Sequence, residues 1–325
     1  MMDNRDVLFA NEFVEEHYTD ELDIVIYNRV IGDEYIDKIK VLREKFGFKI
    51  IVDVDDIWHL DDHHILAKYY IEEQFAARQI RQIRNADIVL TTHARMAKYI
   101  SSFNSNVHVC PNAIPHQGQF DITREESEFT RLFWQGSITH KEDIRILTRP
   151  IEALGPVAER IKMVLGGYTR YDDNETPKTA EEKQTEAEWS EMAMIFTAKA
   201  KHQYKLLPPE PVTNYYSMYA HADICLVPLV NSFFNRMKSN LKVLEAANLS
   251  LPVIASDVHP YKDLPIRYCK HPNDWIKHIT DYLKEPEKAK EDGLRLKDFC
   301  NEFYNFSKIN LERRQILEQA SKQIA

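Results

Sequence analysis

The sequence predicts an α/β protein in which two domains follow one another along the chain, each built on a parallel sheet covered by helices. Three observations predict this class. Short apolar runs alternate with polar, helix-periodic stretches, as in parallel sheets that are buried on both faces. The alternation stops near residues 115–123 and then starts again. The length of 325 residues suits two domains that each bury a core.

The first alternation occupies roughly residues 23–111. Short apolar runs between polar segments predict buried strands. We expect these strands at residues 23–27, 49–54, 87–91 and 107–111. Apolar residues spaced three and four apart predict helices at residues 35–46, 64–85 and 94–101.

The second alternation begins after residue 130. It predicts strands at residues 131–135, 161–165, 202–207, 223–230 and 252–255. Helices are expected at residues 141–154, 214–220 and 241–248, followed by a mostly helical end from residue 273 to residue 324. The segment 169–190 carries five glutamates against two lysines, which predicts an exposed loop or helix.

Composition excludes several classes of protein. The net charge is −9, and residues 1–118 carry 13 Lys and Arg against 20 Asp and Glu, which is atypical of a binder of the nucleic-acid backbone. There are only 8 glycines, and the chain contains neither GxGxxG nor GxxxxGK[ST], so a dinucleotide fingerprint and a P-loop are both excluded. The 4 cysteines lie at least 31 residues apart and form no zinc pattern.

The cysteines and the N-terminus bear on location. Reduced cysteines are typical of cytosolic proteins. The first residues are polar and acidic, and no apolar run approaches the ~18 residues of a membrane span. We therefore expect a cytoplasmic protein without a transmembrane segment.

The most informative segment is residues 235–247, which follow a predicted strand and enter a predicted helix. Ligands of open α/β sheets bind beyond the carboxyl ends of the strands, and a helix N-terminus attracts phosphate. Lys238, Lys242 and Glu245 share one helix face. A carboxylate there could bond a ribose diol, whereas a solvated helix face or a Lys242–Glu245 surface pair would give the same pattern. The predicted ligand contacts are Arg236, Lys238, Ser239, Asn240, Leu241 and Glu245.

A second candidate is the glycine turn after the predicted strand 131–135. Backbone amides after Gly136 could face a diphosphate, and Ser137, Thr139 and His140 supply side-chain donors. A capped strand-to-helix turn without a ligand is the simpler alternative.

These segments resemble the donor site of GT-B glycosyltransferases of the group-1, family-4-like type. The resemblance rests on Leu244-Glu-Ala-Ala and Pro252-Val-Ile-Ala-Ser256, on the Gly136 turn, and more weakly on Val109-Cys-Pro-Asn-Ala113 and residues 215–230. It covers roughly residues 50–265. It implies that Glu245 holds the ribose of a UDP- or GDP-linked sugar, that transfer proceeds with retention, and that no metal or other cofactor is required.

The same resemblance implies two Rossmann-like domains facing across a cleft, with a C-terminal helix crossing back to the N-terminal domain. We assign residues 1–118 to an N-terminal acceptor domain, residues 119–303 to a donor domain and residues 304–325 to the crossing helix. The family's usual first glutamate is Met237 here, and its usual arginine and lysine near the glycine turn are Ser137 and Asp143. The chain thus resembles a phage or bacterial subgroup with a Lys-Ser-x-Leu-Lys loop.

Acids and histidines cluster after the predicted strand 49–54. Asp55, Asp56 and His59 are the candidate catalytic residues, because an acid or a histidine could position or deprotonate an acceptor hydroxyl. A metal site and a capped turn with solvated acids are the alternatives. Arg78, Arg81 and Arg84 could form a basic strip on the helix predicted for residues 64–85, although a solvated helix face is the simpler alternative.

The sequence therefore predicts a hexosyl- or pentosyltransferase that takes a sugar from a nucleotide diphosphate to an acceptor hydroxyl. The acceptor is a glycan, a peptide or a hydroxymethylated DNA base. A non-catalytic nucleotide-sugar-binding protein and a UDP-sugar epimerase are the alternatives.

Overall fold

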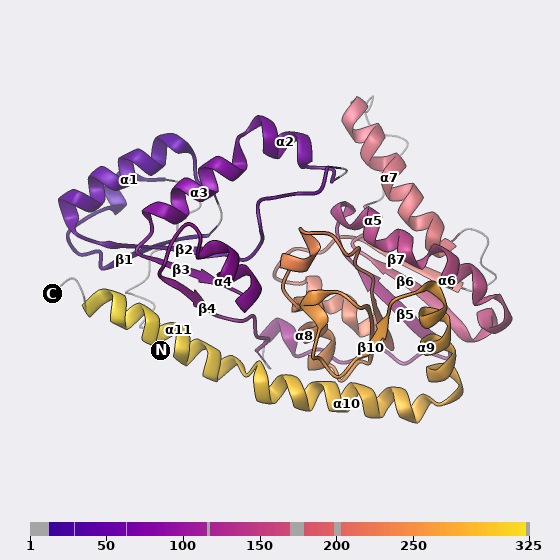
Figure 1. The fold of residues 1–325 in the computed structure, drawn as a ribbon. Helices are drawn as coiled ribbons and strands as arrows, with labels where there is room; N and C mark the ends of the chain where they lie inside the picture. Colours follow the sequence, from indigo (N-terminus) through magenta and orange to yellow (C-terminus); the bar gives the residue numbers. More distant parts are fainter. Residues whose placement is uncertain are drawn as a thin grey trace. The chain divides into compact units, whose positions relative to one another are not determined.

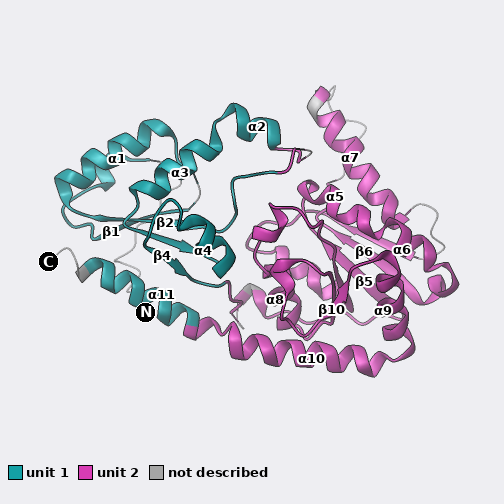
Figure 2. Cartoon of the chain, in the orientation of Figure 1, with its two compact units in different colours: residues 1–60, 67–111, 309–325 teal, residues 61–66, 112–308 magenta. Residues whose placement is uncertain are grey.

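The computed structural model describes residues 13–28, 30–62, 64–115, 118–169, 179–197 and 203–322. It contains two sheets with helices against them (Figure 1), and the chain divides into two compact units (Figure 2). Unit 1 consists of residues 1–60, 67–111 and 309–325, and unit 2 consists of residues 61–66 and 112–308.

Unit 1 is built on four parallel strands in the order β1-β2-β3-β4. The strands are β1 (Ile24–Asn28), β2 (Lys49–Val54), β3 (Ile88–Thr91) and β4 (Val107–Val109). The helices are α1 (Asp33–Phe46), α2 (Ala67–Glu72), α3 (Phe75–Asn85), α4 (Ala94–Ile100) and, from residue 309 on, α11 (Phe306–Lys322). Ile316, Leu317 and Ala320 of α11 pack against the fully buried Ile51 and Leu90 of the sheet. The C-terminal helix therefore returns to the N-terminal sheet, as the resemblance implied.

Unit 2 is built on six parallel strands in the order β10-β9-β8-β5-β6-β7. The strands are β5 (Thr130–Gln135), β6 (Ile161–Gly166), β7 (Gln203–Leu207), β8 (Ile224–Val227), β9 (Val253–Ser256) and β10 (Arg267–Cys269). The helices are α5 (Lys141–Ile144), α6 (Thr148–Ala153), α7 (Ala180–Thr197), α8 (Leu241–Asn248), α9 (Pro272–Lys284) and α10 (Pro286–Phe303).

The apolar run of β5 explains why this strand lies in the middle of its sheet. Successive side chains of a strand point to opposite faces. Leu132 and Trp134 accordingly belong to the core cluster on one face, and Phe133 belongs to the cluster on the other. All three are at most 1% exposed, as expected for a strand covered on both sides.

Helix α10 lies close to the chain between α8 and β9, where Gly293 meets Ser250. A Cβ atom on Gly293 would lie 2.0 Å from the Ser250 carbonyl oxygen. Only glycine allows this approach, so α10 is fixed against unit 2 at this point.

The structure corrects several expectations. The helix expected at residues 64–85 is two helices, with Gln74 in the left-handed region at φ 49° and residues 61–66 belonging to unit 2. The segment holds no Gly or Pro that would have indicated the break. The helix expected at residues 141–154 is interrupted by a 3-10 turn, and Tyr215–His221 is a 3-10 helix. Strand β10 was not predicted.

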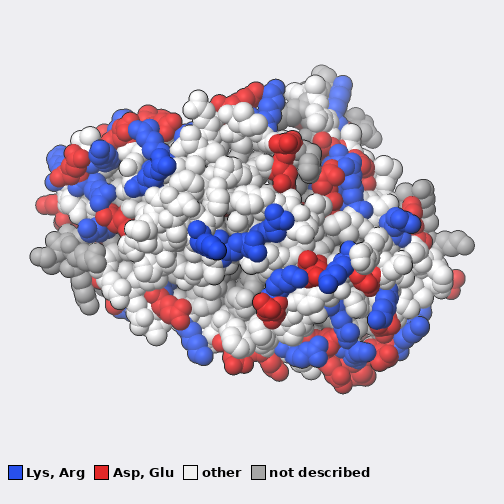
Figure 3. Space-filling model, viewed as in Figure 1, with Lys and Arg blue, Asp and Glu red and all other residues white. Residues whose placement is uncertain are grey.

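Residues 170–178 lie outside the described residues, and α7 forms the end of the glutamate-rich segment. All four cysteines are buried and free. Among the residues that the structure describes, no helix is both long and apolar enough to cross a membrane. Acidic and basic side chains lie next to one another along α10 (Figure 3), where they form pairs such as Arg295–Asp292.

Candidate functional site

The glycine turn after β5 is tightly packed against the neighbouring strand. The Gly136 amide donates to the Gly166 carbonyl oxygen at 3.2 Å. Gly167 has φ 90°, and a Cβ atom on it would lie 2.6 Å from the Gly136 carbonyl oxygen. Ser137 is exposed, and its hydroxyl bonds the Thr139 hydroxyl at 2.6 Å. The turn thus keeps its backbone close to β6 and presents small polar side chains beside it.

His140 and Asp143 follow the turn and form a buried pair. His140 Nδ1 lies 2.7 Å from Asp143 Oδ2. Burial, together with the charges of Lys242 and Lys238, lowers the pKa of His140 to about 3. Burial raises the pKa of Asp143, but the hydrogen bond to His140, the charge of Lys238 and the hydrogen bond from the Val230 amide outweigh that effect, so the pKa of Asp143 is lowered. We therefore treat Asp143 as an anion and His140 as neutral, with Nδ1–H donating to the carboxylate.

Asp143 also anchors the loop that follows β8. Its Oδ1 accepts from the Val230 amide at 2.8 Å and from Asn235 Nδ2 at 2.9 Å. Asn235 is 5% exposed and also donates to the Val230 carbonyl at 3.0 Å. Asp143 is thus a buried structural anion that holds the loop leading to Lys238.

The loop and the start of α8 carry most of the predicted ligand contacts. Arg236 donates to Asn231 Oδ1 at 3.2 Å, and Ser239 Oγ accepts from Asn112 Nδ2 at 3.0 Å. Asn240 is the N-cap residue of α8, yet its side chain caps no backbone amide. Leu241 is partly buried against the apolar core. Met237, at the position of the family's first glutamate, is 5% exposed and belongs to the core.

Glu245 lies inside the protein rather than on a solvated helix face. Its side chain is 1% exposed, and its carboxylate accepts from Tyr215 at 2.5 Å, from Tyr219 at 2.7 Å and from Gln135 Nε2 at 3.4 Å. Burial raises the pKa of Glu245, although the two tyrosine hydroxyls, the Lys242 charge and the Gln135 amide each lower it. The alternatives of a solvated helix face and of a surface pair with Lys242 are therefore wrong for Glu245.

Lys242 joins α8 to the glycine turn. Its Nζ donates to the Gln135 carbonyl oxygen at 2.8 Å and lies 5.3 Å from the centre of the Trp134 ring. Burial and the neighbouring Lys238 charge lower the pKa of Lys242 to about 8. The structure thus brings the Gly136 turn and the segment from Lys238 to Glu245 together at the carboxyl ends of β5 and β8. The sequence did not indicate Gln135, Tyr215, Tyr219 or Lys242 as site residues, although it predicted that Lys242 and Glu245 share one face of a helix.

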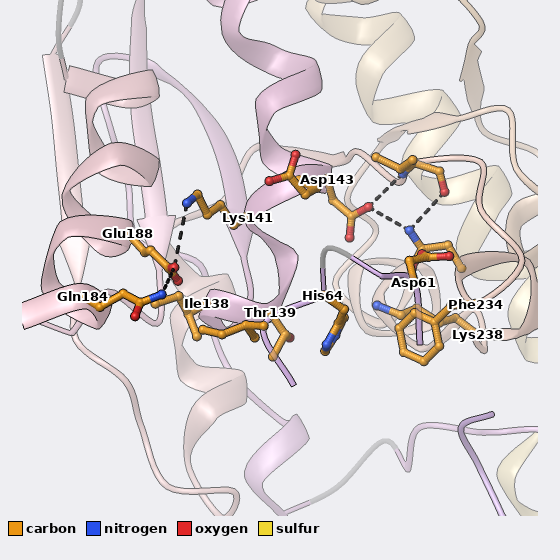
Figure 4. A pocket seen from close by; sticks show the side chains of 14 residues that line it. Asp61, His64, Ile138, Thr139, Lys141, Asp143, Gln184, Glu188, Phe234 and Lys238 are labelled. Carbon is orange, nitrogen blue, oxygen red and sulfur yellow. Dashed lines mark hydrogen bonds and ion pairs between the residues drawn. The ribbon is translucent and has the colours of Figure 1, made fainter. Parts of the chain in front are cut away.

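A pocket of about 210 Å³ within unit 2 is lined by Lys238 and by residues of the Gly136 turn (Figure 4). Thr139 and Lys238 line it, and so do His64 and Phe234, whose rings pack edge to face with centroids 5.4 Å apart. Its charged lining residues are Asp61, Lys141, Glu142, Asp143, Glu188 and Lys238. Lys141 pairs with Glu188 at 4.0 Å and with Glu191 at 3.0 Å.

The predicted catalytic residues belong to unit 1. Asp55 is half-buried and Asp56 is exposed, and both follow the last residue of β2. His59 is exposed, and its ring meets Tyr99 edge-on with centroids 6.0 Å apart. Partial burial lowers the pKa of His59. In the described part of the chain, no group of three or more His, Cys, Asp or Glu residues is arranged to hold a metal ion.

Two of the three arginines of α3 that the sequence suggested as a basic strip are paired with acids. Arg81 bonds Asp33 at 3.1 Å and Asp37 at 2.5 Å, and Arg78 bonds Glu73 at 3.2 Å. The carboxylates of α1 and of the α2–α3 turn therefore neutralise part of this face.

Comparisons with known proteins identify the fold. No family model matches the sequence, and no curated protein matches it significantly. Solved structures do match. Sucrose-phosphate synthase from Thermosynechococcus elongatus has a TM-score of 0.60 at 15% identity, over 91% of this chain and 73% of that one. HepE from Anabaena in complex with UDP-glucose has a TM-score of 0.63 at 10% identity, over 92% and 79%.

A third match is trehalose-6-phosphate synthase, which was studied for glycosyl transfer with retention. Its TM-score is 0.63 at 11% identity, over 92% of this chain and 74% of that one. The chain has the GT-B glycosyltransferase fold. This result confirms the fold class that the sequence predicted.

Proposed function

We propose that this chain is a glycosyltransferase that moves a sugar from a UDP- or GDP-linked donor to an acceptor hydroxyl. The observation that carries the proposal is the contact between α8 and the glycine turn. Lys242 Nζ lies 2.8 Å from the Gln135 carbonyl oxygen, and Gln135 Nε2 lies 3.4 Å from the Glu245 carboxylate. A diphosphate needs cations and a ribose needs a hydrogen-bond acceptor, and both lie at the edge where α/β sheets bind ligands.

Within this proposal, Glu245 takes the ribose, and Lys238, Lys242 and the Gly136 turn take the diphosphate. Together with burial, the charges of Lys238 and Lys242 lower the pKa of His140, and the charge of Lys238 lowers that of Lys242. The same charges would stabilise the negative charge of the leaving nucleoside diphosphate. Half-buried Lys242 would replace a cation that the resembled family usually has near the turn. Asp55, Asp56 or His59 would position or deprotonate the acceptor hydroxyl.

We assign the transferred sugar to the pocket beside Thr139 and Lys238, because the sugar is joined to the phosphate that these residues would hold. Four carboxylates and two lysines line the pocket, and one of those lysines pairs with Glu188 and Glu191. Like charges brought close together are unfavourable, so a neutral hexose suits this pocket better than a sugar acid. The comparison with trehalose-6-phosphate synthase supports retention at the anomeric carbon.

We propose a glycan or peptide hydroxyl as the acceptor, in preference to a DNA base. Residues 1–118 are acidic overall, and Arg78 and Arg81 are paired with acids. Binding to DNA releases counterions and falls steeply with salt. Salt-dependent binding to duplex DNA with nanomolar affinity would overturn this choice of acceptor.

The experiment that tests the function is calorimetric titration of UDP and GDP. We expect at least one of them to bind, and Lys238→Ala to weaken that binding by about tenfold, the cost of one charge-assisted contact. Lys288→Ala, whose side chain is 41% exposed on α10, is the matched control and should change nothing. Absence of binding by both nucleotides would remove the donor assignment, and equal affinity in Lys238→Ala would remove the role of Lys238.

A further inference from the structure

The carboxylate of Glu245 is enclosed by two tyrosine hydroxyls that hold its two oxygens separately. Tyr215 donates to Oε1 at 2.5 Å, and Tyr219 donates to Oε2 at 2.7 Å. Burying a carboxylate without partners is very costly, so these bonds are needed to keep Glu245 inside the protein. A ribose hydroxyl that binds Oε1 therefore either joins the Tyr215 hydroxyl there or replaces it.

The two tyrosines differ in how firmly they are held. Tyr219 is 2% exposed, packs in the core with its ring centroid 5.0 Å from that of Phe133, and has Gln135 Nε2 3.4 Å from its hydroxyl. Tyr215 is only partly buried and packs at the margin of the same core. Within the described residues, the Tyr215 hydroxyl bonds Glu245 alone. Tyr215 can move away without opening the core, whereas Tyr219 cannot.

We propose that Tyr219 is a positioning residue that fixes Glu245, and that Tyr215 is a latch whose hydroxyl is replaced by a ribose hydroxyl when a nucleotide binds. The proposal rests on the proposed function. A ribose hydroxyl and a phenol hydroxyl are both O–H donors, so the exchange leaves Oε1 with the same number of hydrogen bonds. The nucleotide therefore reaches a buried carboxylate without leaving it unpaired at any stage.

The latch predicts opposite effects for two similar substitutions. Tyr215→Phe removes the competing donor and should tighten UDP binding by about twofold to tenfold, the factor for one ordinary hydrogen bond. Tyr219→Phe releases Oε2, so Glu245 loses its fixed orientation and UDP binding should weaken by a similar factor. Both changes keep the aromatic ring and leave no large cavity.

Titration of UDP and 2′,3′-dideoxy-UDP into both variants tests the latch. The dideoxy compound lacks both ribose hydroxyls, so its affinity should be unchanged in Tyr215→Phe, and the preference for UDP should shrink in Tyr219→Phe. Tyr204→Phe is the control, because Tyr204 is 52% exposed on β7. Thermal melting of each variant checks that it is folded. If GDP is the nucleotide that binds, the same series uses GDP and its dideoxy analogue.

The outcomes separate this inference from the proposed function. If the two variants change UDP affinity in the same direction, or if neither changes the preference for UDP over the dideoxy analogue, the latch is wrong. If the unmodified protein binds UDP and dideoxy-UDP equally, the ribose contact is wrong while diphosphate binding stands. If no nucleoside diphosphate binds, the proposed function fails, and the latch fails with it.

Discussion

Replacing Asp143 tests whether this buried anion organises the loop that carries Lys238. Asp143 is 4% exposed and accepts three hydrogen bonds, from the Val230 amide at 2.8 Å, from Asn235 at 2.9 Å and from His140 at 2.7 Å. Asp143→Ala leaves these buried donors without an acceptor. An unsatisfied buried polar group costs about 1–3 kcal/mol, and the costs within one network are not additive. We expect a loss of about 2–4 kcal/mol in the free energy of unfolding.

Asp143→Asn separates the charge from the shape. Asparagine keeps one oxygen for Val230 and Asn235 but turns an amide donor toward His140, so we expect a smaller loss of about 1–2 kcal/mol. Urea unfolding followed by tryptophan fluorescence measures both losses, because Trp134, Trp189 and Trp275 all lie in unit 2. Glu287→Ala, whose side chain is 84% exposed, is the control and should stay within about 0.5 kcal/mol of the unmodified protein.

The expected order of stability is therefore the unmodified protein first, then Asp143→Asn, then Asp143→Ala. A loss below about 1 kcal/mol for Asp143→Ala would show that water or a rearranged loop satisfies the three donors, and would refute the anchoring role. The slope of free energy against urea must stay the same in all variants for the comparison to hold.

Two further predictions concern residues around the glycine turn. The pKa of Lys242 is lowered to about 8, and a bound diphosphate would raise it, so UDP affinity should fall as the pH rises from 7 to 9. Lys242→Arg should abolish that fall, because arginine stays charged over this range. A flat profile in the unmodified protein would contradict the role of Lys242. Gly167→Ala should lower the free energy of unfolding by more than about 1 kcal/mol, because φ is 90° and the added Cβ would lie 2.6 Å from the Gly136 carbonyl oxygen. Gly155→Ala is the control and should change the free energy of unfolding little, because a Cβ atom there meets open space. Equal effects of the two substitutions in urea unfolding would refute the strain at Gly167.

Much of the fold could be predicted from hydrophobic patterning. Strands such as β2 and β6 are mostly apolar, because both faces of a parallel sheet are buried, and their predicted bounds agree with the structure to within one residue. The break at Gln74 could not be predicted, because no Gly or Pro accompanies it. It lies beside a tertiary contact, the stacking of the Tyr70 and Phe75 rings with centroids 4.1 Å apart, which no local pattern encodes.

The candidate site was predictable as two segments but not as a network. The motif identified Glu245 and the Gly136 turn, and parallel topology brings them to one sheet edge. The tyrosines that bond Glu245 come from the 3-10 helix Tyr215–His221, and their role depends on tertiary contacts that no local pattern encodes. In the sequence, Asp143 stands where the resembled family usually has a lysine, so its position indicated only the loss of a cation. Its hydrogen bonds from Val230 and Asn235 show that it holds the loop after β8.

Release of a nucleoside diphosphate from a nucleotide sugar would show whether the chain transfers sugars. Purified protein is incubated with UDP-glucose, UDP-glucuronic acid, GDP-mannose or GDP-mannuronic acid, and UDP or GDP is measured with and without candidate acceptor sugars. We expect release from at least one neutral donor, faster with an acceptor, slower from the matching sugar acid, and slower by about tenfold in Lys238→Ala. Binding of a nucleotide without release from any of the four donors would contradict the claim and would indicate a protein that binds nucleotide sugars without transferring them.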